Sequence, residues 1–157
     1  FQIYDTTNGT TSPTGMNNNM YSGPDLYGPG FYAFSADNAY HYFAAHEASG
    51  RLRAYRWNHP PSIAPTELIS VDRMPTALLQ DKRLLSEGTF DTLLFGPLGE
   101  RIGVLRTGST HFSHEHLVGG TWYCYFTRVT RIEGKDGSTV YIDIYRHPSS
   151  GLADLAE

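Results

Sequence analysis

The sequence is poor in cysteine and has neither a long apolar run nor a surplus of basic residues. Cys124 is the only cysteine among the 157 residues, which excludes an internal disulfide and a cysteine-based zinc site. No stretch approaches the roughly 20 apolar residues of a membrane span, so we expect no membrane contact. The net charge is −4 and basic residues form no long run, so electrostatic binding of nucleic acid is disfavoured.

Aromatic residues, in contrast, are frequent. They make up 13% of the sequence, and 11 of them are tyrosines. Tyrosines line many ligand sites, but they also favour β-strands, and we assign most of these residues to strands. The aromatic stretch 122–126 surrounds Cys124 and predicts a buried, structural thiol rather than a nucleophile. The length predicts one domain over residues 1–157, and we expect a monomer.

Alternating apolar and polar residues predict a sheet that is mainly antiparallel. The strongest signal is a hairpin, in which two alternating segments flank a turn at 133–137 with two glycines. Residues 5–30 are rich in Thr, Asn, Gly and Pro and predict a long loop, which in a small domain is typically functional or mobile. The predicted strands are 1–4, 31–34, 51–57, 67–71, 90–95, 101–106, 121–132 and 138–146.

Two helices are also predicted. Ser35 is a favourable N-cap for a helix over residues 36–49, and Gly50 is a suitable C-cap. Pro75 can open a second helix over 76–86, which Gly88 would end. Helices combined with a mainly antiparallel sheet give the expected fold class, α+β.

The segment 113–122 carries the main candidate for catalysis. It reads Ser-His-Glu-His-Leu-Val-Gly-Gly-Thr-Trp, so Glu115 is expected at the start of a strand, before a tight glycine break. A catalytic carboxylate needs a rigid position of this kind. Strand alternation predicts that Ser113 and Glu115 share one face and that His114 and His116 share the other.

Three segments follow one another in an order found in a known family. Residues 27–35 form a glycine-aromatic strand, residues 37–57 a predicted alanine-rich helix and then a strand, and residues 115–123 a Glu before apolar residues, a glycine break and a long strand. In this order they resemble the mono-ADP-ribosyltransferase family of bacterial toxins and effectors. The closing hairpin is also similar to that family.

The resemblance implies two mainly antiparallel sheets around an NAD cleft, with one or two helices. It implies transfer of ADP-ribose from NAD to a protein, with release of nicotinamide and no metal. Glu115 is then the catalytic carboxylate, Tyr32 the platform for nicotinamide, and Ser35 a group that supports Glu115. Tyr32 as an ordinary core aromatic and Ser35 as a plain helix cap stay open as alternatives. The residues expected to contact NAD are Asp5, Gly30, Phe31, Tyr32 and Ser35.

Two positions depart from the family pattern and bear on the acceptor. The first strand of the family carries an Arg or a His, whereas residues 3–6 read Ile-Tyr-Asp-Thr, with Asp5 among them. Two residues before the Glu, arginine-modifying members have Glu or Gln, whereas this chain has Ser113. We therefore expect an acceptor other than arginine, such as a threonine hydroxyl, conceivably on ubiquitin. Ser113 and Phe112 are the expected acceptor contacts.

The resemblance also implies a biological setting. It predicts a secreted bacterial effector or toxin that acts on a protein in the cytosol of a host or target cell. Two other interpretations remain open. One is a metal-binding barrel of the cupin type that uses His114 and His116. The other is a catalytically inactive binding module that recognises a partner through the tyrosine-rich surface and the loop 5–30.

Overall fold

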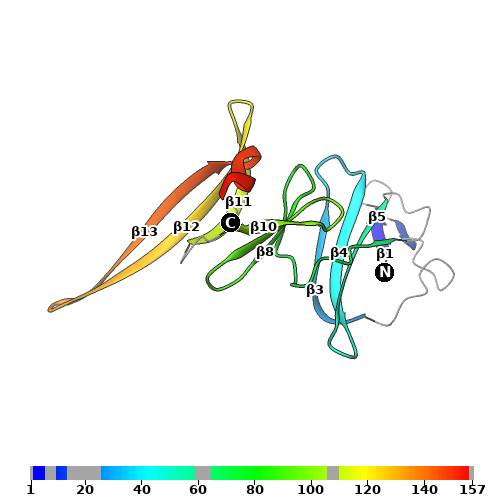
Figure 1. Ribbon diagram of the computed structural model, residues 1–157, viewed down its shortest axis with the longest axis horizontal. Coiled ribbons are helices and arrows are strands. Elements are labelled where there is room, and N and C mark those ends of the chain that lie inside the picture. The colour runs from blue at the N-terminus through cyan, green and yellow to red at the C-terminus, as the bar shows by residue number, and fades with distance from the viewer. Residues whose placement is uncertain (1, 6–9, 14–25, 59–64, 106–109, 156–157) are drawn as a thin grey trace.

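The computed structural model describes residues 2–5, 10–13, 26–58, 65–105 and 110–155 and consists mostly of antiparallel strands (Figure 1). Its elements are β1 (Gln2–Asp5), β2 (Thr10–Pro13), β3 (Leu26–Phe34), β4 (Tyr40–Glu47), β5 (Leu52–Asn58), β6 (Thr66–Glu67), β7 (Ala77–Leu78), β8 (Leu84–Glu87), β9 (Thr92–Phe95), β10 (Arg101–Leu105), β11 (Thr110–Val118), β12 (Thr121–Gly134), β13 (Gly137–Pro148) and the 3₁₀-helix η1 (Ser149–Leu155).

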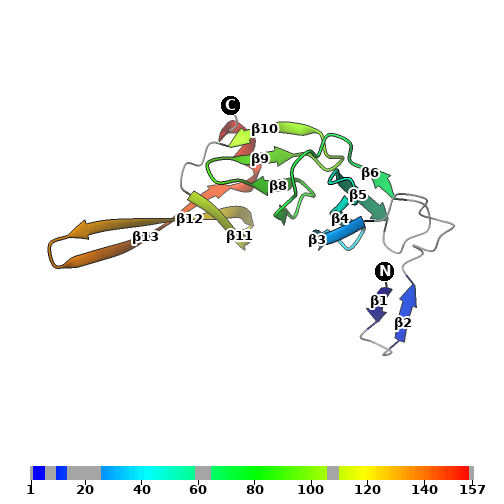
Figure 2. The same cartoon turned by 90° about the horizontal axis from the view of Figure 1, so that it is seen from below.

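The strands form three sheets and a separate hairpin, β1–β2. The first sheet has the order β3-β4-β5-β6, the central sheet β10-β9-β8-β7, and the third sheet β11-β12-β13. Neighbours in each sheet are also neighbours in the sequence, and the pairs are antiparallel. In Figures 1 and 2 the central sheet lies between the other two.

The central sheet is buried on both of its faces. Residues Leu84 and Phe95, which are opposite each other in the register, belong to a cluster with Tyr42 and Ala54 of the first sheet. Leu85 and Leu94, which follow Leu84 and precede Phe95 in the sequence, point the other way. They belong to a second cluster, with residues of the third sheet and η1. The members of that second cluster are Leu79, Leu85, Leu94, Leu105, Cys124, Phe126 and Leu152.

The helix predicted over residues 36–49 is wrong. After a turn in which Asn38 has a φ of 58°, this segment forms β4, and residues 41–45 are buried in succession. Their side chains pack on both sides of the first sheet, because Tyr42 and Ala44 enter one cluster while Phe43 enters another, with Tyr55 and Trp57. A run that is buried on both faces shows no period of two, so its composition resembled that of a helix. Gly50, the predicted helix cap, instead closes the β4–β5 turn at a φ of 85°.

The helix predicted over residues 76–86 is also wrong. Its two ends form β7 and β8, and the residues between them form a turn in which the amide of Leu79 donates to the carbonyl of Arg83 at 2.8 Å. Lys82 adopts a φ of 73°, a conformation that sequence patterns associate with Gly or Asn. The 3₁₀-helix η1, the one helix among the described residues, was not predicted.

Several predicted strands are confirmed. The segments 51–57, 90–95 and 101–106 correspond to β5, β9 and β10, and the strong hairpin corresponds to β12–β13. Of the predicted strand 67–71 only Glu67 is in a strand, because β6 consists of Thr66–Glu67. Gly119 and Gly120, with φ of 56° and 82°, form the two-residue turn between β11 and β12. Glu115 therefore lies in the middle of β11 rather than at its start.

The interval 5–30, predicted as a loop, contains β2 and most of β3 among the residues that the structure describes. No helix within the described ranges is long and apolar enough to cross a membrane.

Gly99 is expected to be a sensitive position for stability. Its φ is 82°, and an added Cβ would lie 2.7 Å from the Cβ of Leu68, in the core. Gly50 has a similar φ of 85° but nothing within 4 Å of such an atom. We predict that Gly99→Ala lowers the free energy of unfolding by about 2–5 kcal/mol, because backbone strain and overpacking add.

Gly50→Ala, the matched control, should lose only about 1–2 kcal/mol, from backbone strain alone. Urea denaturation of both variants measures the difference. Equal losses would show that the contact between Gly99 and Leu68 is not tight.

Candidate functional site

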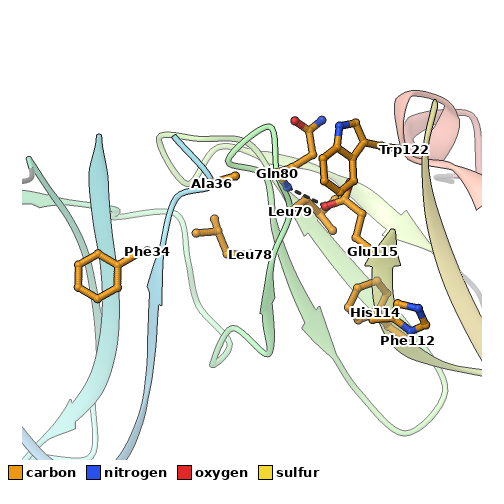
Figure 3. Close-up of a pocket in the computed structure, with 9 residues that line it drawn as sticks. All are labelled: Phe34, Ala36, Leu78, Leu79, Gln80, Phe112, His114, Glu115 and Trp122. Carbon is orange, nitrogen blue, oxygen red and sulfur yellow. Dashed lines mark hydrogen bonds between the residues drawn. The ribbon is translucent and has the colours of Figure 1, made fainter. Parts of the chain in front are cut away.

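A pocket of about 350 Å³ lies where strands or turns of all three sheets meet (Figure 3). The first sheet contributes the end of β3, the central sheet contributes β7 and the turn after it, and the third sheet contributes β11 and the start of β12. Its walls are largely apolar and aromatic, with a single carboxylate, that of Glu115. The lining residues are Phe34, Ala36, Leu78, Leu79, Gln80, Phe112, His114, Glu115 and Trp122.

The Glu115 carboxylate is held on one side and unpartnered on the other. Its Oε2 accepts a hydrogen bond of 2.7 Å from the backbone N–H of Gln80. This bond joins β11 of the third sheet to the β7–β8 turn of the central sheet. Its Oε1 is buried and has no hydrogen-bond partner among the described residues. A buried acceptor without a donor costs about 1–3 kcal/mol. A ligand that donates a hydrogen bond in this pocket would remove that cost.

A β-bulge at Ser113 determines which side chains accompany Glu115. Phe112 pairs with Phe126, whereas His114 pairs with Tyr125, so Ser113 is left between two register positions. The bulge places Phe112, rather than Ser113, on the buried face with Glu115. Ser113 is exposed, and its Oγ lies 3.2 Å from Nδ1 of His114.

His114 and His116 alternate with Glu115 along β11, as predicted, but His114 also lines the pocket with Glu115, whereas His116 does not. His114 stacks on Tyr125 with a centroid distance of 5.0 Å and an interplanar angle of 3°. The rings of His114 and His116 are 6.1 Å apart, and both residues are exposed. Among the residues that the structure describes, no three His, Cys, Asp or Glu side chains are grouped to hold a metal ion. The cupin interpretation therefore gains no support from this part of the chain.

The aromatic residue that β3 contributes to the pocket is Phe34. Tyr32, the predicted nicotinamide platform, is 57% exposed and is not among the lining residues. Phe34 lies two residues further along the strand and stacks on His41 with centroids 4.8 Å apart. Phe31 packs half-buried against the core, on the other face of β3.

Gly30 has a structural reason for being glycine. An added Cβ would lie 2.4 Å from the carbonyl oxygen of Ala44, on the neighbouring strand. Gly30 lies where the β3–β4 register shifts, between Tyr27 and Phe31. The requirement for glycine here is explained by this close approach of two backbones. Asp5 pairs with Thr10 in β1–β2, and its side chain lies outside the described residues.

Ser35 is buried, but its hydroxyl serves the turn between β3 and β4. It donates to Oδ1 of Asp37 at 2.6 Å and accepts from the backbone N–H of Tyr40 at 2.9 Å. Ser35 is not among the lining residues, and its described hydrogen bonds do not involve Glu115. Ser35 thus holds the β3–β4 turn, whereas the sequence predicted it as a helix cap or as a support for Glu115.

An ion pair joins the two turns that border the pocket. Nζ of Lys82, in the β7–β8 turn, lies 2.7 Å from Oδ2 of Asp37, in the β3–β4 turn. The hydrogen bond from Lys82 lowers the pKa of Asp37 well below its usual range, and Asp37 raises the pKa of Lys82. Because the Asp37 side chain is half exposed and that of Lys82 is partly exposed, the pair positions the turns more than it stabilises the fold.

Sequence reasoning missed most of the residues that surround Glu115. Leu78, Leu79 and Gln80 fell within a predicted helix, and the group that holds the carboxylate is a backbone N–H, which leaves no signature in a sequence. Trp122 was part of the recognised motif but received no role. Its position two residues after the glycine turn was the available signal.

Comparison with known proteins adds no relative to this description. The chain matches no protein-family model, no curated protein and no solved structure. The pocket and the sequence motifs are therefore the features that indicate a function.

Cys124 is directly opposite Glu115 in the register, and its buried Sγ lies 3.3 Å from Oγ of Ser149. Burial raises the pKa of the Cys124 thiol from 9.0 to about 11. The folded protein therefore keeps the thiol proton in a pH range in which the unfolded chain loses it. This contribution to stability is complete below pH 9 and is lost as the pH rises towards 11.

We predict that the advantage in unfolding free energy of wild type over Cys124→Ala shrinks by about 2 kcal/mol between pH 8 and 11. Denaturant titrations of both proteins at a series of pH values measure it. A difference that stays constant with pH would contradict the buried, neutral thiol.

Proposed function

We propose that this protein transfers ADP-ribose from NAD to a hydroxyl group on a protein acceptor and that Glu115 is the catalytic carboxylate. The observation that carries the proposal is the buried, unpartnered Oε1 of Glu115 in the wall of an aromatic pocket. The sequence resemblance to mono-ADP-ribosyltransferases supports it independently, because it singled out the same residue. The proposed family fold and the setting of a secreted effector depend on that resemblance alone.

The pocket has a chemistry that suits the nicotinamide end of NAD. The nicotinamide ring of NAD is planar and cationic, and such rings are attracted by aromatic faces and by carboxylates. Phe34, Phe112 and Trp122 supply the aromatic surface and Glu115 the negative charge. The volume of about 350 Å³ is at the lower end of ligand pockets and suits one part of a dinucleotide rather than the whole.

Glu115 can act on the ribose without forming a bond to it. As the bond between nicotinamide and ribose C1′ breaks, its electron pair leaves with nicotinamide and positive charge develops on the ribose. A carboxylate that accepts a hydrogen bond from the ribose 2′-OH orients the sugar and stabilises this charge. The Gln80 N–H holds Oε2, so Oε1 is the oxygen without a partner. It reaches a ribose hydroxyl once the carboxylate turns it from its buried position towards the pocket.

The surroundings of the carboxylate favour a neutral acceptor over arginine. Ser113, at the bulge, is exposed and supplies no second carboxylate to bind a guanidinium. In the proposed transfer the acceptor hydroxyl oxygen bonds to ribose C1′ in place of nicotinamide, and its proton passes to solvent water. A threonine of the acceptor, conceivably on ubiquitin, fits this requirement. Phe112 packs edge to face on Phe126, with centroids 5.9 Å apart, so its main contact is within the protein.

Replacing Glu115 by Gln tests the catalytic role. The change removes the negative charge but keeps an oxygen that can accept from Gln80, so we expect the fold to persist. Loss of preorganised charge stabilisation should reduce nicotinamide release from NAD by about 100-fold or more, measured with a cell lysate as the source of acceptor.

Glu47→Gln is the matched control, because Glu47 lies at the end of β4 and is not among the pocket residues. It should leave the rate unchanged. Equal rates for wild type and Glu115→Gln, or no turnover of NAD by wild type with any lysate, would count against the proposed reaction.

Binding is tested separately from turnover. Trp122 lines the pocket, whereas Trp57, the second of the two tryptophans, is fully buried in the first sheet. We predict that NAD changes the tryptophan fluorescence of wild type and that this change disappears in Trp122→Leu. NAD binding with normal affinity but without turnover would assign the chain to the non-enzymatic binding modules. An unchanged NAD response in Trp122→Leu would place the nucleotide elsewhere.

A further inference from the structure

The distal part of the β12–β13 hairpin forms an arm that extends away from the three sheets (Figures 1 and 2). Among the described residues the last pair between β11 and β12 is Thr110 with Arg128, so from Val129 onward the described part of the arm has two strands. A two-stranded ribbon is marginally stable by itself in water. Large apolar side chains nevertheless lie exposed along it: Val129, Ile132, Val140, Tyr141 and Ile142. Ile144 and Tyr145, also exposed, follow at its base, where β12 pairs with β11 as well.

The two faces of the arm differ in composition. Pairing of Val129 with Ile142 places these side chains on one face, together with Val140 and Ile144, their neighbours two residues along β13. These four residues are between 56% and 68% exposed, and we call them the aliphatic ladder. The opposite face includes the Arg128–Asp143 ion pair, with N and O atoms 3.0 Å apart.

The charges at the two ends of the ladder face are complementary. Towards the tip, Glu133 lies on this face and forms an ion pair of 2.8 Å with Arg131. Towards the base, Arg146 pairs in register with Tyr125 and lies 4.3 Å over the ring of Tyr123. The tip thus carries the Glu133 carboxylate with the Arg131 guanidinium beside it on the same face, and the base carries the Arg146 guanidinium over the ring of Tyr123.

The spacing of these charges is symmetric about the centre of the ladder. Glu133 lies four residues from Val129 towards the tip, and the Tyr125–Arg146 pair lies four residues from it towards the base. At about 3.3 Å per residue, both are roughly 13 Å from the centre. Two arms stacked antiparallel about a two-fold axis at Val129 and Ile142 would bring Glu133 of each copy to the level of Arg146 of the other.

We propose that the aliphatic ladder is a self-association surface, on which a second copy of this chain docks its own ladder face to face in antiparallel orientation. The dimer buries Val129 and Ile142 at its centre, and Val140 of each copy meets Ile144 of the other. Reciprocal contacts between Glu133 and Arg146 fix the orientation. This inference does not depend on the proposed reaction, and it replaces the monomer expected from the sequence.

The available area indicates a weak dimer. Burying a Val or Ile side chain removes on the order of 60–120 Å² of apolar surface. The ladder therefore offers about 400 Å² per copy, roughly half of what each partner buries in a standard interface. We expect dissociation constants of about 1–100 μM, so that association depends on concentration in the micromolar range.

Sedimentation velocity of the whole chain, from about 1 μM to 1 mM, tests the proposal. Wild type should pass from monomer to dimer, and Ile142→Glu should raise the dissociation constant at least about tenfold by placing a charge in the apolar centre. Tyr141→Ser, the control on the opposite face of the same strand, should dimerise as wild type does. A thermal melt of each variant verifies its fold.

A charge exchange tests the antiparallel orientation. Glu133→Arg and Arg146→Glu should each weaken the dimer, because like charges then meet, and the double variant should restore it. Wild type that stays monomeric at 1 mM overturns the proposal. Sedimentation of this monomer with phosphatidylcholine vesicles would instead assign the ladder to a membrane surface. A dimer that Tyr141→Ser disrupts and Ile142→Glu does not would place the contact on the opposite face.

Discussion

The arrangement of this protein depends on a central sheet that is buried on both faces. Leu84, Leu93 and Phe95 pack against the first sheet, while Leu85 and Leu94 pack against the third sheet and η1. Each of these side chains is 5% exposed or less, although β8 and β9 have only four residues each. Removal of a single such side chain would affect one interface directly and the other through the shared backbone.

The candidate site is a consequence of this layered packing. The β7–β8 turn projects from the central sheet to the point where the other two sheets approach each other, and there the amide of Gln80 meets Glu115. The same turn carries Lys82, which pairs with Asp37 of the first sheet. One short turn thus connects all three sheets, and the geometry of the carboxylate depends on how well the central sheet is packed.

The sequence predicted elements well where one face of a strand is polar. The alternation in β12–β13 predicted a hairpin that the structure confirms, and the predicted glycine break at Gly119–Gly120 is the turn between β11 and β12. Prediction failed where both faces are buried, as in residues 41–45, because continuous burial removes the period that distinguishes a strand from a helix. The bulge at Ser113 was also beyond prediction, since a register shift depends on the pairing partner as much as on the strand itself.

The residues of the candidate site also divide into those that a local sequence pattern identifies and those that only tertiary packing brings together. Glu115 could be singled out because its motif is local in sequence, whereas Gln80 and Phe34 come close to it only through packing between sheets. Tyr32 and Ser35 were chosen by position in a motif, and the structure gives them different surroundings, an exposed strand face and a turn. A local motif can identify the reactive group, but the residues that shape its pocket are determined by the tertiary fold.

The β11–β12 ribbon separates two kinds of chemistry by the alternation of its side chains. One face carries Glu115, Cys124 and Phe126, which belong to the pocket and the core. The other face carries His114 on Tyr125 and continues into the aliphatic ladder. A partner docked on the ladder would approach the ribbon from the side opposite Glu115. Occupation of the arm and access to the pocket are therefore compatible, since one ribbon presents them on different faces.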